Sequence, residues 1–133
     1  MKVLLTFYGE ELTGLDSSPE QIAQTFEGWG AFDAATRAAG VLIACEGLET
    51  GDMATTIRVG AGDRHVTDGP FMETKEQLGG FALLEVRDLD EAMAWAARTP
   101  WNGDGQITEI RPVMDYEQYA ARLQGTGLEG ATP

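Results

Sequence analysis

The feature that most constrains the fold is a repeated switch between two spacings of apolar residues. In residues 2–8, Val3, Leu5 and Phe7 alternate with other residues, which is the period of a strand with one buried face. Between residues 18 and 40 the apolar residues recur at helical spacing instead. Further strands are expected at 41–48, 55–59, 64–67, 81–86 and 106–113, and further helices after residue 88 and at 115–123. This order predicts an α+β fold of the ferredoxin-like, split βαβ type, with an inserted β-hairpin and two helices on one face of an antiparallel sheet.

Local signals predict where the helices begin and end. Ser18, followed by Pro19 and Gln21, is typical of an N-cap with a capping box. Gly40 stands where a helix usually ends. The apolar residues expected to face the sheet are Ile22, Phe26, Trp29 and Phe32 in the first helix, and Leu89, Met93 and Ala96 in the second.

The rest of the chain divides into turns and a tail. Residues 60–63 join the two strands of the hairpin, and Asp68–Gly80 is a turn-rich segment in which one helical turn is expected at 74–78. We predict a single domain over residues 1–123 and a flexible C-terminal tail over residues 124–133, which are rich in Gly and Thr.

Charge excludes two classes of partner. Nine Lys and Arg stand against 22 Asp and Glu, which gives a net charge of −13. Such a surface repels nucleic-acid backbones and anionic membranes, so neither is expected to bind. The chain has no apolar run of the roughly 20 residues that cross a membrane, and its first residues do not resemble a signal peptide. Its single cysteine forms no internal disulfide, which favours a cytoplasmic location.

The sheet face opposite the helices predicts a homodimer. Strand alternation places Leu4, Leu42, Phe81 and Leu83 on that face, where they would form an exposed apolar patch unless a second copy covered them. Polar residues follow at the other end of the same rows, and Phe71 lies in the turn-rich segment nearby. The side chains expected to line a half-polar cavity in the dimer are Tyr8, Glu46, Phe71, Glu85, Glu109 and Arg111. For Tyr8, Glu46, Glu109 and Arg111 the alternative is a set of salt bridges at the rim of the dimer interface.

One long motif carries a family resemblance. Residues 68–81 read DGPFMETKEQLGGF, and this string resembles the signature of the DGPF group within the YCII-related family. The segments FYGE, RAAGVLIACEGL, TTIRV and LDEAMAWAARTP resemble the same group, so the resemblance covers residues from about 2 to 113. It implies the ferredoxin-like fold and a dimeric α+β barrel.

Four residues are candidates for acid/base chemistry. Asp68 and Lys75 in the turn-rich segment, Glu46 on the second strand and His65 on the hairpin could transfer protons if burial tuned their pKa values. The alternatives are structural: Asp68 caps a turn above a buried Phe71, Lys75 pairs with a neighbouring glutamate, and His65 is an exposed strand residue. One His and one Cys do not make a metal site, and no cofactor motif is present, so we expect neither.

Two classes of function follow. Some members of the wider family resemble small-molecule lyases or dehydrochlorinases with a His on the first helix and an Asp as a proposed dyad. Trp29 stands near the place of that His, so the dyad does not carry over. The first class is therefore a dimeric domain that binds a small ligand or a protein, and the resemblance implies an accessory role beside an extracytoplasmic-function sigma factor. The second is a cofactor-independent enzyme of the lyase or isomerase type, acting by proton transfer in the dimer cavity.

Overall fold

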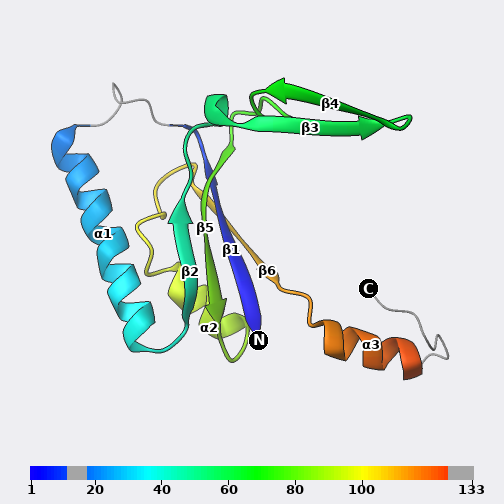
Figure 1. Cartoon of the computed structure of the whole chain (residues 1–133). Coiled ribbons are helices and arrows are strands. Elements are labelled where there is room, and N and C mark those ends of the chain that lie inside the picture. The colour runs from blue at the N-terminus through cyan, green and yellow to red at the C-terminus, as the bar shows by residue number, and fades with distance from the viewer. Residues whose placement is uncertain (12–17, 126–133) are drawn as a thin grey trace.

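The computed structural model describes residues 1–11 and 18–125, and it confirms the α+β class (Figure 1). Its main sheet is antiparallel, with the strand order β2-β5-β1-β6. These strands are β1 (Lys2–Gly9), β2 (Leu42–Gly47), β5 (Gln77–Glu85) and β6 (Ile107–Pro112). A separate two-stranded sheet is formed by β3 (Thr55–Gly60) and β4 (Asp63–Asp68). The helices are α1 (Pro19–Ala38), α2 (Leu89–Ala96) and α3 (Tyr116–Gly125), with a short 3-10 turn, η1 (Gly51–Met53), before β3.

Helix α1 begins and ends as its sequence predicts. The Ser18 hydroxyl accepts a hydrogen bond from the Gln21 backbone N–H at 3.1 Å, and the Gln21 side chain accepts one from the Ser18 N–H at 2.9 Å. This capping box satisfies two of the backbone donors that a helix leaves without intrahelical partners. After the helix, Gly40 adopts a φ of +73°, a left-handed conformation that favours glycine.

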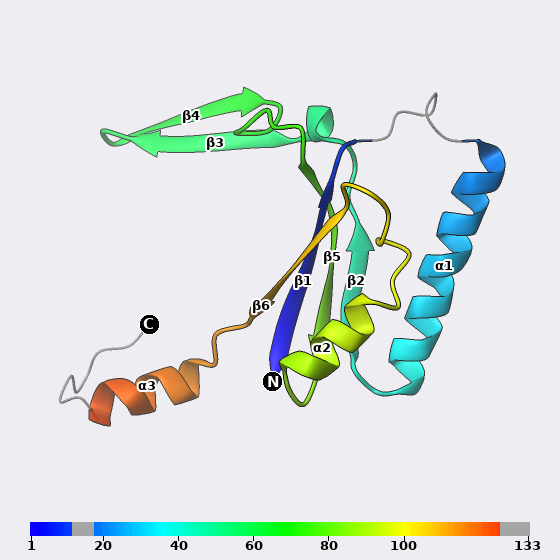
Figure 2. The ribbon, with the colours of Figure 1, turned by 180° about the vertical axis from the view of Figure 1, so that it is seen from behind.

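Helices α1 and α2 pack on the same face of the main sheet. A single core joins Val3, Leu5 and Phe7 of β1 to Phe32 of α1 and to Trp95 of α2, and all are 8% exposed or less (Figure 2). The predicted inner faces of the helices need two corrections. Helix α2 buries Ala92 and Trp95, whereas Leu89 and Met93 are 51% and 47% exposed. In α1, Ile22 and Phe26 are 40% and 72% exposed.

The face of the main sheet opposite α1 and α2, which we call the open face, carries most of the residues expected there. Leu4, Thr6 and Tyr8 of β1 and Phe81 and Leu83 of β5 are half-buried and alternate with the core residues. Leu42 is the exception. A register irregularity between Leu42 and Ala44 sets Leu42 opposite the buried Leu84 and packs it against the core. A β-bulge of this kind changes which face a side chain occupies.

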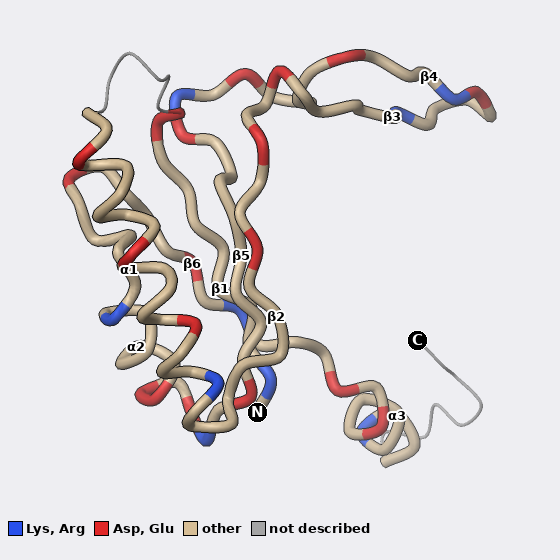
Figure 3. The backbone as a smooth tube through the Cα atoms, turned by 60° about the vertical axis from the view of Figure 1, so that its left-hand side comes forward, with Lys and Arg blue, Asp and Glu red and all other residues tan. Residues whose placement is uncertain are grey.

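Two parts of the chain extend beyond the main sheet and the helices α1 and α2 that cover it. The hairpin formed by β3 and β4, which we call the hairpin arm, projects from one end of the sheet, and α3 extends from the other (Figures 1 and 3). Every residue of β4 is exposed. The expected helical turn at 74–78 is wrong, because β5 already begins at Gln77. The predicted tail 124–133 lies outside the described residues from residue 126 onward, and α3 continues to Gly125.

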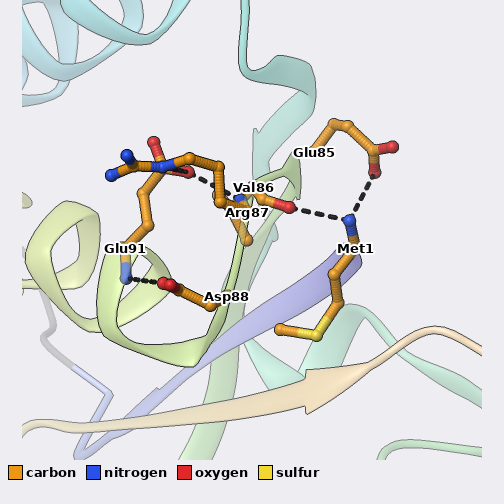
Figure 4. A network of polar contacts seen from close by, with 6 residues as sticks. All are labelled: Met1, Glu85, Val86, Arg87, Asp88 and Glu91. Carbon is orange, nitrogen blue, oxygen red and sulfur yellow. Dashed lines mark hydrogen bonds and ion pairs between the residues drawn. The ribbon is translucent and has the colours of Figure 1, made fainter.

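A polar network holds the start of β1 against the end of β5 (Figure 4). The Met1 ammonium donates a hydrogen bond to the Val86 carbonyl at 2.7 Å and lies 3.8 Å from the Glu85 carboxylate. Beside it, the Asp88 carboxylate caps α2 by accepting from the Glu91 N–H at 2.8 Å. The outer end of the sheet is thus tied to the beginning of α2.

Candidate functional site

A cavity of about 430 Å³ opens between α1 and the neighbouring edge of the main sheet. One stripe of α1 forms its first wall, with residues spaced so that they share a face of the helix. Strands β2 and β5 form the second wall. The α1 stripe consists of Thr25, Phe26, Trp29, Gly30 and Asp33, and the strands contribute Cys45, Glu46, Gly47, Gly79 and Gly80. We call this space the α1 cavity.

Aromatic rings form the inner end of the α1 cavity. Phe7 and Trp29 meet edge to face with ring centroids 5.1 Å apart, and the Trp101 ring centroid lies 6.3 Å from that of Phe7. The Trp101 indole N–H donates to the carbonyls of Tyr8 at 3.0 Å and Ile107 at 3.2 Å. These bonds fix the Trp101 ring across the ends of β1 and β6, so this wall is preformed.

Glycines create the space and the close contact between its walls. A Cβ atom at Gly80 would lie 2.8 Å from the Glu46 carbonyl oxygen, so β2 approaches β5 closely only because residue 80 has no side chain. A Cβ at Gly30, on the opposite wall, would meet nothing within 4 Å. Gly80 belongs to the long motif of residues 68–81, and one reason for that motif is therefore the shape of this cavity.

The polar groups at the α1 cavity are acidic. Burial raises the pKa of the Cys45 thiol, and the nearby Asp33 and Glu46 carboxylates raise it further. A thiol held in its protonated form is a poor nucleophile. Asp33 also forms an ion pair with Arg37 at 2.8 Å, and the Arg37 side chain is 70% exposed. No Lys, Arg or His is among the lining residues of the cavity, which fits the excess of Asp and Glu over the described surface (Figure 3).

The hairpin arm separates two candidate acid/base residues. His65 and Asp68 lie three residues apart on β4, and their partners on β3 are Arg58 and Thr55. Residues at odd spacing on a strand point to opposite faces, so β4 directs these two side chains away from each other. His65 therefore lies on the exposed arm, as the structural alternative predicts, and the structure does not bring it to Asp68.

The turn after β4 is held by Gly69 rather than by Asp68. Among the described residues no hydrogen bond reaches the Asp68 carboxylate, which corrects its predicted role as a turn cap. Gly69 instead donates from its N–H to the Ala54 carbonyl at 2.7 Å and accepts from the Thr56 hydroxyl at 2.7 Å. Its φ of +95° is a conformation that favours glycine.

The next two residues of the motif with predicted roles are both exposed. Phe71 is 67% exposed, so the prediction that it fills apolar space below the turn is wrong for the single chain. Lys75 is exposed as well, and none of the ion pairs within the described part of the chain includes it. The expected pairing of Lys75 with a neighbouring glutamate is therefore not seen.

The residues predicted to line a shared cavity are divided between different places. Glu46 is among the residues that line the α1 cavity, but it pairs with Phe81, so strand alternation directs its side chain to the open face. Tyr8, Glu109 and Arg111 lie on the open face, where the Arg111 guanidinium donates to Glu109 at 2.8 Å. Glu85 lies at the outer end of β5 beside the N-terminal ammonium. Whether these groups line a cavity in a dimer stays a prediction.

Four lining residues of the α1 cavity are not predicted as site residues from the sequence: Phe26, Trp29, Asp33 and Trp101. The helical apolar stripe predicts Phe26 and Trp29 as core residues instead. The α1 stripe, however, is wider than the sheet contact requires, and Gly30 interrupts it beside Trp29. A glycine next to a tryptophan inside a helix was the available signal, because it leaves space that a core helix would fill.

Comparison with known proteins gives a family. The family model of the YCII-related domain matches residues 1–117. An uncharacterized protein of Rhizobium meliloti (strain 1021) is 45% identical over 65 residues, which cover 48% of this chain and 52% of that protein. The chain therefore spans about half the length of the curated relative that it matches. Within the described residues, no helix is both long and apolar enough to cross a membrane.

Proposed function

The chain belongs to the YCII-related family, and from this premise we propose that it is a dimeric binding protein that holds a small organic molecule in the α1 cavity. The observation that carries the proposal is the cavity itself. Its 430 Å³ lies within the range of small-molecule sites, and its walls combine aromatic rings with a few polar groups. Trp29 and Trp101 are already positioned by contacts within the chain, so a ligand would meet a preformed surface.

Binding has more support than turnover. Proton transfer would need an acid and a base within reach of one ligand. His65, Asp68 and Lys75 lie on or next to the hairpin arm, whereas Glu46 borders the α1 cavity. The Cys45 thiol is held protonated, which disfavours nucleophilic chemistry at the same place. A role beside a sigma factor remains an expectation from the resemblance, and the free thiol of Cys45 is in keeping with the proposed cytoplasmic location.

The dimer belongs to the same proposal. The strand order β2-β5-β1-β6 is that of a ferredoxin-like sheet, which supports the proposed dimeric α+β barrel. In such a dimer the open faces of two sheets would cover each other. The Thr6 hydroxyl oxygen lies in this face, is buried, and has no hydrogen-bond partner among the described residues. A buried hydroxyl without a partner is costly, and a second copy would bring polar groups near it.

The hairpin arm and α3 also favour a second copy. Both extend to the side of the sheet opposite α1 and α2 (Figures 1 and 3). The arm exposes Ile57, Val59 and Val66 by 52%, 73% and 61%, and Tyr116 at the start of α3 is 62% exposed. Apolar side chains that flank one open sheet face are suited to reach around a partner seated on that face.

The ligand proposal is tested with Gly30→Leu. A Cβ atom at residue 30 meets no atom within 4 Å, and Leu favours helix over Gly, so the variant is expected to fold at least as stably as the wild type. Indole and benzyl alcohol serve as probes, with thermal shift and tryptophan fluorescence as readouts. Wild-type protein and an Ala34→Leu control, altered at an exposed position outside the lining, should respond. Gly30→Leu should not. Equal responses in all three proteins would contradict the proposed site.

The dimer proposal is tested with Leu83→Glu. Leu83 lies on the open face opposite Leu4, so a charge there would be buried between two sheets. We expect light scattering to show a monomer, while Met93→Glu, altered at an exposed position of α2, stays dimeric. A Leu83→Glu protein that remains dimeric at low concentration would exclude this interface.

A further inference from the structure

The α1 cavity combines aromatic rings with an acidic side chain, and the described residues that line it include no basic one. Phe26 lies in its wall although it is 72% exposed, while Phe32, on the same helix, is 2% exposed and belongs to the core. The chain thus keeps a large aromatic side chain exposed at this opening. Exposed aromatic rings beside acidic groups are the features by which proteins recognise organic ammonium ions, because the ring face and the carboxylate both attract positive charge.

We propose that the ligand of the α1 cavity is a small organic cation, an amine or quaternary ammonium carried on an apolar body. This inference rests on the proposed binding function and names its ligand class. The apolar body contacts Phe7, Trp29 and Trp101 at the inner end, and the cationic group lies toward Asp33. An anionic ligand would meet the Asp33 carboxylate there, and none of the described lining residues is a Lys, Arg or His that could compensate it.

Arg37 and Cys45 both bear on how much negative charge acts at the α1 cavity. Arg37 offsets part of the Asp33 charge, but its side chain is mostly exposed and is not part of the cavity lining. Cys45, by contrast, is part of the lining and responds to the local field. Burial raises the pKa of its thiol most, and the Asp33 carboxylate that would attract a cation raises it further, as does the neighbouring Glu46. Negative charge therefore acts at the wall of the cavity.

The overall charge of the protein must be separated from this local effect. With a net charge of −13, any cation is attracted weakly to the whole surface. Asp33→Asn and Glu27→Gln remove the same charge from the same helix, but residue 27 is not part of the cavity lining. A difference between these two variants reports the local site.

The experiment compares three ligands of similar size: benzyltrimethylammonium, benzyl alcohol and benzoate. Titrations followed by tryptophan fluorescence and calorimetry use the full chain, Asp33→Asn, Glu27→Gln and Gly30→Leu. We expect the cation to bind most tightly. Asp33→Asn should weaken it by about two- to thirtyfold, the range spanned by single cation–aromatic and charge contacts, and Glu27→Gln by less than about twofold.

Cys45 supplies an independent readout, because it is the only cysteine of the chain. Thiolate absorbance gives its titration midpoint. Bound benzyltrimethylammonium should lower that midpoint, since a cation stabilises the thiolate, whereas benzyl alcohol should not. Asp33→Asn should lower it without any ligand, because one of the two carboxylates that raise the pKa of the thiol is removed.

The outcomes distinguish the two proposals. If benzyl alcohol or benzoate binds as tightly as the cation, and Gly30→Leu abolishes binding, the cavity is a ligand site but the cation inference is wrong. If Asp33→Asn and Glu27→Gln weaken the cation equally, the attraction belongs to the whole surface and the inference is also wrong. If no probe binds, or if Gly30→Leu binds all of them as well as the wild type, the proposed function itself fails.

Discussion

The helix-covered sheet and the hairpin arm use similar apolar residues with different results. In β1, Val3, Leu5 and Phe7 are at most 2% exposed, because α1 and α2 cover that face of the sheet. In β4, Val66 is 61% exposed, although β4 is fully paired with β3. Ladder hydrogen bonds therefore form in both regions, but only one of them has a layer packed on it. An isolated two-stranded hairpin is marginally stable in water, so the arm needs another surface to become rigid.

The largest expected difference between the two regions comes from matched truncations. Leu84→Ala removes a side chain that is 0% exposed and should lower the free energy of unfolding by about 2–5 kcal/mol. Ile57→Ala, on the arm, should change it by less than about 0.5 kcal/mol in the monomer. Urea unfolding at low protein concentration measures both.

Repeating that measurement at high concentration sharpens the comparison. If the arm packs on a second copy, Ile57→Ala should become destabilising only where the dimer forms. An Ile57→Ala effect as large as that of Leu84→Ala at every concentration would mean that the arm is buried within its own chain.

A second contrast lies within one pair of neighbouring strands. Gly47 and Gly80 face each other across β2 and β5, but only a Cβ at Gly80 meets backbone, at 2.8 Å from the Glu46 oxygen. Gly80→Ala should therefore cost about 1–3 kcal/mol through strain, whereas Gly47→Ala should be neutral or slightly stabilising. Thermal unfolding of the two variants decides this, and equal stability would show that β2 moves aside easily.

Features that depend on local spacing could be predicted from the sequence, whereas a bulge and the buried face of a short helix could not. Periodicity and capping residues predicted α1 with its capping box and the α+β class, because each depends on local spacing or on one buried face. They did not predict the position of Leu42, because a bulge in β2 cannot be recognised from alternation alone. The prediction of which α2 residues face the sheet was wrong, because Ala92 and Trp95 fit the helical period as well as Leu89 and Met93 do.

The candidate site was the harder part. The 68–81 motif led to the predicted site residues Asp68, Phe71 and Lys75. From that stretch, however, only Gly79 and Gly80 line the cavity. The rest of its lining comes from α1, β2, Phe7 and Trp101, which lie outside the motif in the sequence. Only the tertiary fold brings these segments together, so a motif interpreted by itself indicates a family more reliably than a site.

A smaller effect is expected where the hairpin arm joins the sheet. Thr56→Val removes the hydrogen bond from the Thr56 hydroxyl to the Gly69 carbonyl, and amide exchange in β3 and β4 should become about two- to tenfold faster. Asp68→Ala should change exchange by less than about twofold, because no hydrogen bond from the described residues reaches that carboxylate. Faster exchange in Asp68→Ala than in Thr56→Val would restore the predicted role of Asp68 in the turn.

The smallest effect concerns acid stability at the start of α2, in the helix-covered half. The Arg87 backbone N–H donates to the Glu91 carboxylate at 2.7 Å, and this bond is the main reason why the pKa of Glu91 is lowered (Figure 4). A carboxyl group whose folded pKa lies below its unfolded value stabilises the fold above the unfolded pKa. That contribution is lost as the pH falls through the folded pKa. Glu91→Gln should thus be less stable than the wild type at neutral pH, and the difference should shrink as the pH falls through the lowered pKa of Glu91. Asp90→Asn removes a charge from the same first turn of α2 and controls for the helix dipole. Urea unfolding between pH 3 and 7 measures both variants, and a wild-type advantage over Glu91→Gln that stays constant down to pH 3 would mean that the Arg87–Glu91 bond does not bias the ionised carboxylate.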